Sequence, residues 1–445
     1  MNKQSIYNIW VENILYNSLS NQLISFKDNE MDSISHFLEN LEEFEKEYPD
    51  LFEKFMQKGF IIKSDFDELD YIYYQNKKEV FLNKNYRLTI NPTLDCNYHC
   101  WYCCVEDAGT KYEPKRMDDT IIQKVNNHLQ YMVKKDSINS LQLDWFGGEP
   151  LMYFKEVIYP ISKLGLKLSA ENNIPFSNHA TTNAYYIDDA MIKAFNEIHM
   201  NSFQIPIDGH ERKHNSVKNM ENIGHYRQII KNVNALCEQI DNIQIVLRIN
   251  YDTQTLKTIL PVIEDIKANN RKKIFVDFQR VWQVALSKDE SGNNALLLKT
   301  KEEFENAGFN TIYFAFNHKG FKCCYADSFY HRVINYDGKI FKCTARDYSD
   351  DLVIGNLNDD GRIVFNENIL SKMFGDATFK NEKCLKCKIL PLCYGSCIQK
   401  YYEIKTGKKS FSCLYESSEI SFEKYIKDKA FKQINLIRKF STSSM

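Results

Sequence analysis

The sequence has little of what marks several large classes of protein. Only 16 of its 445 residues are glycine and 9 are proline, which is too few for a collagen-like or low-complexity chain. The 57 basic residues nearly balance the 59 acidic ones, which argues against a dedicated nucleic-acid binder, because such proteins are usually strongly basic. Apolar residues form 43% of the chain and charged residues 26%, so wholesale disorder is excluded.

Long apolar stretches are also missing. No run approaches the ~18 apolar residues of a membrane span. The start of the chain, Met1 to Ser5, leads into mixed polar and aromatic residues instead of the apolar block of a secretory signal. We therefore expect a cytoplasmic protein, in which thiols stay reduced. The 13 cysteines then need an explanation in metal binding, catalysis or packing.

The cysteines fall into two groups and one outlier. Cys237 stands alone in a helical pattern, where a small buried hydrophobic residue is expected. The first group is Cys96, Cys100, Cys103 and Cys104, and the second is Cys323, Cys324, Cys343, Cys384, Cys387, Cys393, Cys397 and Cys413. Because cysteines used only for packing would be scattered, the clustering indicates metal centres.

Hydrophobic periodicity divides the chain into five segments. Residues 1–80 predict a small α+β domain with a helical stretch over 31–58, and an acidic linker from Asp65 to Tyr74 near its end. Residues 86–284 predict a strand–helix repeat, 285–310 a connector, 311–420 a cysteine-rich and turn-rich domain, and 421–445 a helical tail. Within the last domain, Asp337-Gly338 predicts a β-hairpin that presents Cys343.

Six strands alternate with helices in the middle of the chain, which favours a parallel α/β sheet. The strands are predicted at 86–91, 141–146, 176–182, 203–207, 243–250 and 274–280, and the helices at 117–134, 152–172, 187–198, 222–239 and 254–268. In such folds, functional groups collect beyond the carboxyl ends of the strands. Polar residues and glycines do follow these strand ends: Cys96, Gly147-Gly148-Glu149, Asn183, Asp208 and Arg248.

The first group has the spacing C-x3-C-x2-C from Cys96 to Cys103. Three thiolates on one short loop can hold three irons of a [4Fe–4S] cube, which ordinarily takes four cysteines. The fourth iron then stays open for a ligand, much as a catalytic metal keeps an open position. A zinc site that includes His99 is the alternative, although no second cysteine pair follows nearby. Cys104 duplicates the third position, and we interpret it as a bystander.

The loop resembles the cysteine motif of the radical S-adenosylmethionine (radical SAM) enzymes. In that superfamily the open iron binds S-adenosylmethionine, whose reductive cleavage gives methionine and a 5′-deoxyadenosyl radical that abstracts hydrogen. Tyr102 matches the aromatic position near the adenine, and Trp145–Pro150 matches the family's Gly-Gly-Glu motif. Gly147 and Gly148 let backbone approach a ligand closely, and Glu149 can accept from an ammonium group.

This resemblance implies a partial (β/α)6 barrel and a set of cofactor-binding residues at its strand ends. The set is Tyr102, Gly147, Gly148, Glu149, Asn183, Gln204, Asp208 and Arg248. For Asn183, Gln204, Asp208 and Arg248, a surface or capping role is the alternative. The catalytic base is not identified.

The order and spacing of the second group resemble the SPASM extension of radical SAM enzymes, which carries two auxiliary [4Fe–4S] clusters. The resemblance implies that Cys324, Cys343 and Cys397 bind the first auxiliary cluster and that Cys384, Cys387, Cys393 and Cys413 bind the second. The fourth position of the first cluster is either Cys323 or open, because neighbouring side chains of an extended segment point to opposite faces. A zinc ribbon is the alternative for the whole group. The expected cofactors are therefore S-adenosylmethionine and three [4Fe–4S] clusters.

Enzymes with this extension mostly modify ribosomal peptides, and one branch matures sulfatases. In that branch an Asp directly follows the cysteine that corresponds to Cys343, whereas Thr344 stands here and the nearest acid is Asp347. We therefore expect an oxidoreductase that matures a precursor peptide by forming a thioether or carbon–carbon crosslink. The alternatives are a sulfatase-maturase-like enzyme that forms formylglycine and a non-catalytic, zinc-binding protein.

The expected partners are a precursor peptide with its leader and a flavodoxin- or ferredoxin-type electron donor, and neither nucleic acid nor membrane. Residues 1–80 are similar, loosely, to the small winged-helix-like domain that binds a leader peptide by strand addition in related enzymes. An ordinary capping domain is the alternative.

Overall fold

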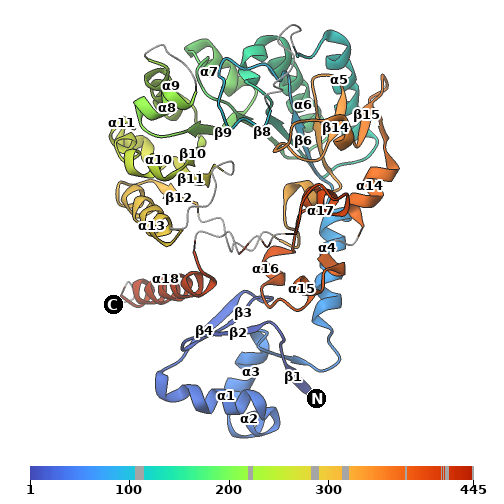
Figure 1. Cartoon of the computed structure of the whole chain (residues 1–445). Coiled ribbons are helices and arrows are strands. Elements are labelled where there is room, and N and C mark those ends of the chain that lie inside the picture. The colour runs from blue at the N-terminus through green and yellow to red at the C-terminus, as the bar shows by residue number, and fades with distance from the viewer. Residues whose placement is uncertain are drawn as a thin grey trace. The chain divides into compact units, whose positions relative to one another are not determined.

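The computed structural model describes residues 1–105, 115–218, 224–281, 290–312, 320–375, 378–411, 413, 415 and 420–442. The chain forms two compact units (Figure 1). The first unit comprises Met1–Asn83, Phe314–Phe329 and Met373–Met445, and the second comprises Lys84–Tyr313 and Tyr330–Lys372. Both units are thus assembled from segments that are far apart in the sequence.

One sheet of 11 strands organises the second unit. Its strands are β6 (Asn85–Ile90), β7 (Ser140–Trp145), β8 (Phe176–Thr181), β9 (Met200–Ile207), β10 (Gln244–Tyr251), β11 (Ile274–Arg280), β12 (Asn310–Thr311), β13 (His331–Ile334), β14 (Lys339–Phe341), β15 (Gly355–Leu357) and β16 (Ile363–Phe365). The spatial order is β12-β11-β10-β9-β8-β7-β6-β13-β14-β15-β16. Neighbouring strands are parallel from β12 to β13 and antiparallel from β13 to β16. This confirms the predicted α/β class, and the mostly parallel sheet is consistent with a partial barrel.

The second unit has ten α-helices among its described residues, and those that connect the parallel strands lie along the outer side of the sheet (Figure 1). They are α5 (Asp119–Lys134), α6 (Tyr159–Glu171), α7 (Asp189–Glu197), α8 (Glu211–Val217), α9 (His225–Gln239), α10 (Thr253–Thr258), α11 (Val262–Asp265), α12 (Ala268–Arg271), α13 (Glu290–Asn306) and α14 (Glu367–Phe374). The helix predicted over 254–268 is instead three short helices, because Pro261 lacks a backbone N–H and stands at the N-cap of α11. Cys237 is buried on α9, as expected.

The predicted hairpin before Cys343 is confirmed. Strands β13 and β14 pair antiparallel, with Ile334 opposite Ile340. Gly338 adopts a φ of +80° in the turn, which a residue with a side chain adopts only with strain. The Gly338 N–H donates to the Asn335 carbonyl at 2.9 Å and closes the turn.

The first unit contains two small antiparallel sheets and eight α-helices among its described residues. Its strands are β1 (Asn2–Gln4), β2 (Asn8–Val11), β3 (Ile14–Asn17), β4 (Gln22–Ser25) and β5 (Ile61–Lys63), and its helices are α1 (Met31–Glu39), α2 (Leu41–Glu47), α3 (Pro49–Gln57), α4 (Glu68–Leu82), α15 (Glu382–Leu385), α16 (Leu390–Cys393), α17 (Ile398–Lys405) and α18 (Phe422–Thr442). Strand β1 pairs with β5, and β2, β3 and β4 form a three-stranded sheet. The helical tail predicted after residue 421 is confirmed as α18.

The two faces of the β2–β3–β4 sheet bury different partners, because alternate residues of a strand face opposite sides. Leu15 packs with Phe44 and Phe55 of α2 and α3. Its neighbour Tyr16 packs with Ile426 of α18. The N-terminal strands therefore lie between helices from both ends of the chain.

One expectation for the N-terminal region was wrong. The segment predicted as a linker from Asp65 to Tyr74 instead enters α4, whose N-cap Asp67 accepts from the backbone N–H groups of Leu69 and Asp70 at 2.9 Å. An Asp at this position is a strong helix start. The helical stretch predicted over 31–58 is confirmed, and it is divided into α1, α2 and α3, of which Pro49 starts the third.

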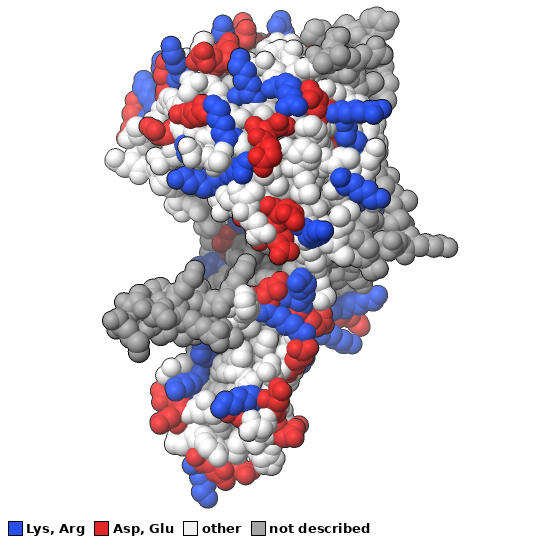
Figure 2. Space-filling view, turned by 90° about the vertical axis from the view of Figure 1, so that its left-hand side faces the viewer, with Lys and Arg blue, Asp and Glu red and all other residues white. Residues whose placement is uncertain are grey.

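Charge is distributed evenly over the face of the molecule drawn in Figure 2. Basic and acidic side chains of the described residues are interspersed there, in keeping with the near balance of 57 and 59 in the sequence. No helix in the described part of the chain is both long enough and apolar enough to cross a membrane.

Replacement of Phe44, which is fully buried, by alanine is expected to destabilise the first unit by roughly 3–5 kcal/mol through the lost burial and the cavity left behind. Tyr74→Ala on α4, where the side chain is 60% exposed, is the control and should leave the unfolding midpoint almost unchanged. Denaturant unfolding of the full chain measures both. Equal midpoints for the two variants would contradict this account of the core.

Candidate active site

The first cysteine group lies on the loop directly after β6. The Tyr98 N–H donates to Cys96 Sγ at 3.4 Å, and the Cys103 N–H donates to the Cys100 carbonyl at 2.9 Å, which closes a tight turn. Burial raises the pKa of Cys96 to about 12 and also raises the pKa of Cys100. These thiols therefore stay protonated unless a metal centre holds them as thiolates.

The donor set of this loop fits an iron–sulfur cube. All described cysteines are free thiols. Among the described residues, no three His, Cys, Asp or Glu side chains lie close enough together to share one metal ion. A cube places each thiolate on a different iron, so its ligands stand farther apart than those of a single ion. Cys96, Cys100 and Cys103 on one short loop offer three such thiolates.

Two glycines after β7 hold the cysteine loop in place. A Cβ on Gly147 would lie 2.2 Å from the Thr93 carbonyl oxygen, and a Cβ on Gly148 would lie 2.1 Å from the Asp95 carbonyl oxygen. The Gly148 N–H donates to Thr93 at 3.0 Å and the Glu149 N–H donates to Asp95 at 2.8 Å. We expected these glycines to let the backbone approach a ligand closely. In the structure, the segment that leads into Cys96 makes this close approach instead.

Glu149 is almost fully buried behind this turn, at 1% exposure. Its carboxylate accepts from the Leu151 N–H at 3.0 Å, the Thr182 hydroxyl at 2.6 Å and the Asn183 N–H at 2.7 Å. Burial raises the pKa of Glu149 to about 7, against the lowering effect of these donors and of Lys218. The carboxyl therefore changes charge close to neutral pH.

Asn183 connects the Glu149 turn to the cysteine loop. Its backbone donates to Glu149, and its side-chain Nδ2 donates to Asn97 Oδ1 at 2.7 Å. Asn97 directly follows Cys96. The ends of the first three parallel strands, predicted to meet at one edge of the sheet, are therefore linked by hydrogen bonds.

Asp208 lies beyond β9 at the centre of a second buried network. The Tyr102 hydroxyl donates to Asp208 Oδ1 and accepts from Asn250 Nδ2 at 2.9 Å. The Lys218 Nζ lies 2.9 Å from Asp208 Oδ2. Asp208 is a buried carboxyl, and burial alone would raise its pKa, but Lys218, His214 and the Tyr102 hydroxyl hold it below the ordinary value. Tyr102 and Asp208, both predicted from the sequence to bind the cofactor, are thus in direct contact.

Gln204 and Arg248 lie on the neighbouring strands β9 and β10. The Arg248 Nε donates to Asn250 Oδ1 at 3.0 Å, so Arg248 joins the Tyr102–Asp208 network through Asn250. Gln204 accepts from the Thr182 N–H through its backbone carbonyl at 3.0 Å. Its side chain shows no contact that assigns it a role.

Other cysteines lie near Cys104, the bystander thiol of the first group, in the folded chain. Cys103 and Cys343 lie near Cys104, and burial raises the pKa of Cys104 to about 11. Cys343 follows β14 of the same unit. The fold thus brings the hairpin cysteine to the loop that carries the first group.

In the first unit, Cys324 and Cys397 face each other. Their thiols lie within hydrogen-bonding reach, which together with burial raises the pKa of Cys397 well above its ordinary value. Asp327 fixes this pair: one carboxylate oxygen accepts from the N–H groups of Cys323 (3.0 Å) and Cys324 (2.8 Å), and the other from Ile398 at 2.8 Å. Sequence reasoning missed Asp327, because a lone acid three residues after a cysteine carries no distinctive spacing.

Four more cysteines of the second group lie close together in another part of the same unit: Cys384, Cys387, Cys393 and Cys413. Cys323 packs against the apolar cluster of Tyr7, Ile72, Leu390 and Tyr394, where Cys384 also packs. Cys323 and Cys324 therefore contact different surroundings, as expected for neighbours in an extended segment: Cys324 has a φ of −143° and a ψ of 161°.

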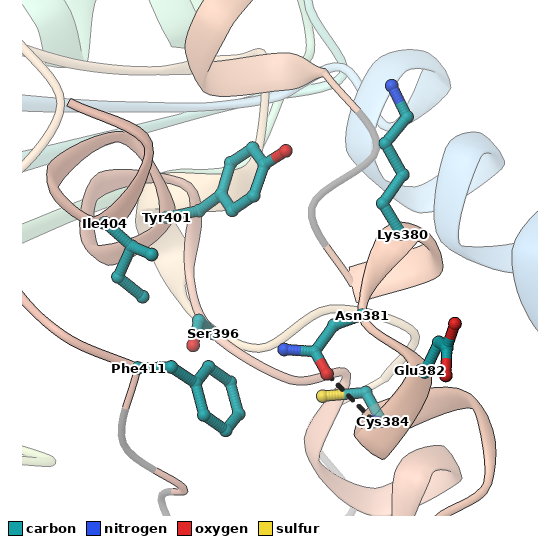
Figure 3. Close-up of a pocket in the computed structure, with 8 residues that line it drawn as sticks. All are labelled: Lys380, Asn381, Glu382, Cys384, Ser396, Tyr401, Ile404 and Phe411. Atoms are coloured by element: carbon teal, nitrogen blue, oxygen red, sulfur yellow. Dashed lines mark hydrogen bonds between the residues drawn. The ribbon is translucent and has the colours of Figure 1, made fainter. Parts of the chain in front are cut away.

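A cavity of about 350 Å³ opens beside Cys384 (Figure 3). Tyr401 and Phe411 form part of its lining, with Ser396 between them in the view. The Asn381 side chain accepts from the Cys384 N–H at 3.4 Å and so helps to fix the thiol at the cavity wall. The cysteine group of the first unit thus borders accessible space.

Gly148→Ala is expected to displace the cysteine loop, because the new methyl group would meet backbone atoms that cannot move aside. The purified variant should bind clearly less iron than the wild type after anaerobic reconstitution, while circular dichroism stays native. Gly165→Ala on α6 is the matched control, because its methyl group would meet only side-chain ends, the nearest at 3.1 Å. Full iron binding by Gly148→Ala would contradict the role given to the glycine turn.

Comparisons with known proteins agree with this geometry. Residues 90–266 match the family model described as the radical SAM superfamily. No curated protein is a significant match to the chain. The fold is similar to that of native anSMEcpe with bound AdoMet, with a TM-score of 0.59 and 19% identity over 79% of this chain and 99% of that one. It is also similar to Streptococcus suis SuiB bound to precursor peptide SuiA, with a TM-score of 0.51 and 17% identity over 95% of this chain and 99% of that one. Residues 90–266 therefore form a domain of the radical SAM superfamily.

Proposed function

We propose that this enzyme matures a ribosomally synthesised peptide by hydrogen abstraction, followed by formation of a thioether or carbon–carbon crosslink. The observation that carries the proposal is the loop of Cys96, Cys100 and Cys103 held against the buried Glu149 turn. The fold likeness to SuiB extends over 95% of the chain, well beyond the radical SAM domain, and that structure contains a precursor peptide. A shared fold is an analogy, so the reaction itself needs a direct test.

When bound, S-adenosylmethionine and a [4Fe–4S] cluster supply a 5′-deoxyadenosyl radical that abstracts hydrogen. In this chain Cys96, Cys100 and Cys103 would hold three irons and leave the fourth open. Glu149 would accept from the amino group of S-adenosylmethionine. Asn183 holds the Glu149 carboxylate and the cysteine loop in register.

The remaining predicted cofactor residues would orient S-adenosylmethionine. Tyr102, which is fixed by Asp208 and Asn250, would lie beside its adenine. Arg248 supports this arrangement through Asn250. Gln204 would extend the lining of the S-adenosylmethionine site along β9. Removal of the Tyr102 ring would then weaken binding more than removal of the Gln204 amide.

Two auxiliary [4Fe–4S] clusters complete the proposal. The cysteine spacing supports them, and so does the grouping within the first unit, where Cys324 faces Cys397 while Cys384 gathers with its neighbours. The separate surroundings of Cys323 favour an open or non-cysteine fourth position at the first auxiliary cluster. A flavodoxin- or ferredoxin-type donor would supply electrons in the reducing environment of the cytoplasm.

We further infer that the first unit binds the leader of the precursor peptide. Strand β4 is an edge of the β2–β3–β4 sheet and pairs on one side only, with β3. An edge strand offers free backbone groups to an extended peptide. The two faces of this sheet are already covered by helices, so addition at an edge is the mode that the fold leaves available.

Anaerobic iron and sulfide analysis tests the cluster assignment. About twelve iron atoms per chain are expected, from three cubes of four. Replacement of Cys96, Cys100 and Cys103 together by alanine should remove about four of them and abolish reductive cleavage of S-adenosylmethionine. Cys237→Ala, which alters a buried packing residue, is the control and should retain both. One or two zinc atoms without sulfide would refute the proposal in favour of a zinc-binding protein.

Affinity for S-adenosylmethionine should depend on pH through Glu149. Its pKa of about 7 means that the carboxyl is protonated below pH 7 in the free enzyme and cannot accept from the amino group. The dissociation constant should therefore be about tenfold higher at pH 6 than at pH 8. Glu149→Gln should bind more weakly at pH 8 and lose this part of the pH dependence. Anaerobic calorimetry measures both, and an identical pH profile for the two proteins would contradict the assignment.

A further inference from the structure

A buried lysine that could not be predicted from the sequence lies beside the cysteine loop. Lys218 directly follows α8 and is only 2% exposed. Its ammonium lies 2.9 Å from Asp208 Oδ2 and close to the Cys100 thiol. Its carbonyl also accepts from the His99 N–H at 3.3 Å, which ties the backbone of Lys218 to the same loop.

The surrounding groups leave Lys218 as the cation that pairs with Asp208. Burial alone would lower the pKa of Lys218, but Asp208, Tyr102 and Cys100 raise it well above its ordinary value. His214, the nearest other basic group to Asp208 at 3.8 Å, is neutral because burial and Lys218 lower its pKa to about 3. The Asp208 N–H donates to His214 Nδ1 at 3.3 Å, which requires that nitrogen to be unprotonated.

A buried ion pair of this kind is not explained by stability. The cost of removing two charges from water often exceeds their mutual attraction, and apolar residues of similar volume can replace such pairs without loss. Hydrogen bonds to the cysteine sulfurs and nearby charge do, however, set the reduction potential of an iron–sulfur cluster. A cation that donates to a ligating thiolate favours the reduced cluster, because reduction adds one negative charge.

We propose that Lys218 is a positioning residue that raises the reduction potential of the cluster held by Cys96, Cys100 and Cys103, acting through the Cys100 thiolate. Asp208 holds the ammonium in place, and Tyr102 and Asn250 in turn hold Asp208. The inference rests on the proposed function, since it needs a cluster on this loop. In this proposal the buried lysine affects the step in which the cluster accepts an electron, and it does not act on the peptide.

Redox titration followed by electron paramagnetic resonance tests the proposal on the reconstituted full chain. The cluster in question is identified as the one whose reduced signal changes when S-adenosylmethionine is added. Lys218→Met, which keeps an unbranched side chain one atom shorter and removes the charge, should shift the midpoint to a more negative value. A tenfold loss in the reduction equilibrium would appear as 59 mV for this one-electron couple. Lys218→Arg should shift it less.

Lys213→Met is the matched control. Lys213 lies on α8, and its ammonium pairs with Asp252 at 2.8 Å, away from the cysteine loop. Its replacement should leave the midpoint unchanged. A shift of equal size in both variants would overturn the proposal, because it would show an effect of net charge alone.

Other outcomes also decide the question. An unchanged midpoint in Lys218→Met with full iron content would overturn the proposal, as would a change confined to the affinity for S-adenosylmethionine. If Lys218→Met fails to bind iron because Asp208 is left unpaired, Asp208→Asn is compared with the double variant that also carries Lys218→Met. A more negative midpoint in the double variant supports the proposal, and equal midpoints overturn it. A wild type without any signal sensitive to S-adenosylmethionine would instead refute the proposed function.

Discussion

The close backbone contact between the turn after β7 and the segment after β6 fixes the rest of the site. Gly147 and Gly148 approach Thr93 and Asp95 so closely that no side chain fits between them. This contact sets the position of Cys96, one residue farther along the chain, and of Glu149, which follows the two glycines. A cysteine loop is otherwise a flexible surface element. Here it is joined by backbone hydrogen bonds to the end of a parallel sheet.

From that contact, hydrogen bonds extend across the carboxyl ends of the parallel strands. Glu149 reaches Thr182 and Asn183 after β8, and Asn183 returns to the cysteine loop through Asn97. Tyr102 reaches Asp208 after β9 and Asn250 on β10. Each link is a charged or amide group removed from water, where an unmade hydrogen bond is costly. The loop is therefore held by several strand ends at once, which is the support that a metal centre with an open position requires.

Much of this organisation could be predicted from the sequence, because the informative features are local. The parallel strands are short apolar segments bounded by polar residues, and all six overlap their predicted ranges. Cysteine spacing and the Gly-Gly-Glu turn are likewise visible without a structure. The role of the two glycines could not be predicted. We expected them to let a ligand approach the backbone, whereas they let another segment of the chain approach it. Only the fold shows which segment lies opposite.

The features that the sequence could not show depend on contacts between distant segments. Lys218 is one of many lysines in the chain, and only its burial against Asp208 and Cys100 distinguishes it. Asp327 likewise gains its role from Ile398, which is 71 residues away. Helix α4 was missed for a different reason, since its aromatic residues obscure the apolar periodicity and the Asp67 cap was overlooked.

The central claim, that the loop of Cys96, Cys100 and Cys103 holds a cluster with an open iron for S-adenosylmethionine, is tested most directly by electron–nuclear double resonance. The reduced enzyme is measured with S-adenosylmethionine labelled with ¹⁵N at its amino group. The account predicts a hyperfine coupling between that nitrogen and the cluster, which disappears when the three cysteines are replaced by alanine. A reduced cluster that binds the labelled cofactor without any nitrogen coupling would contradict it.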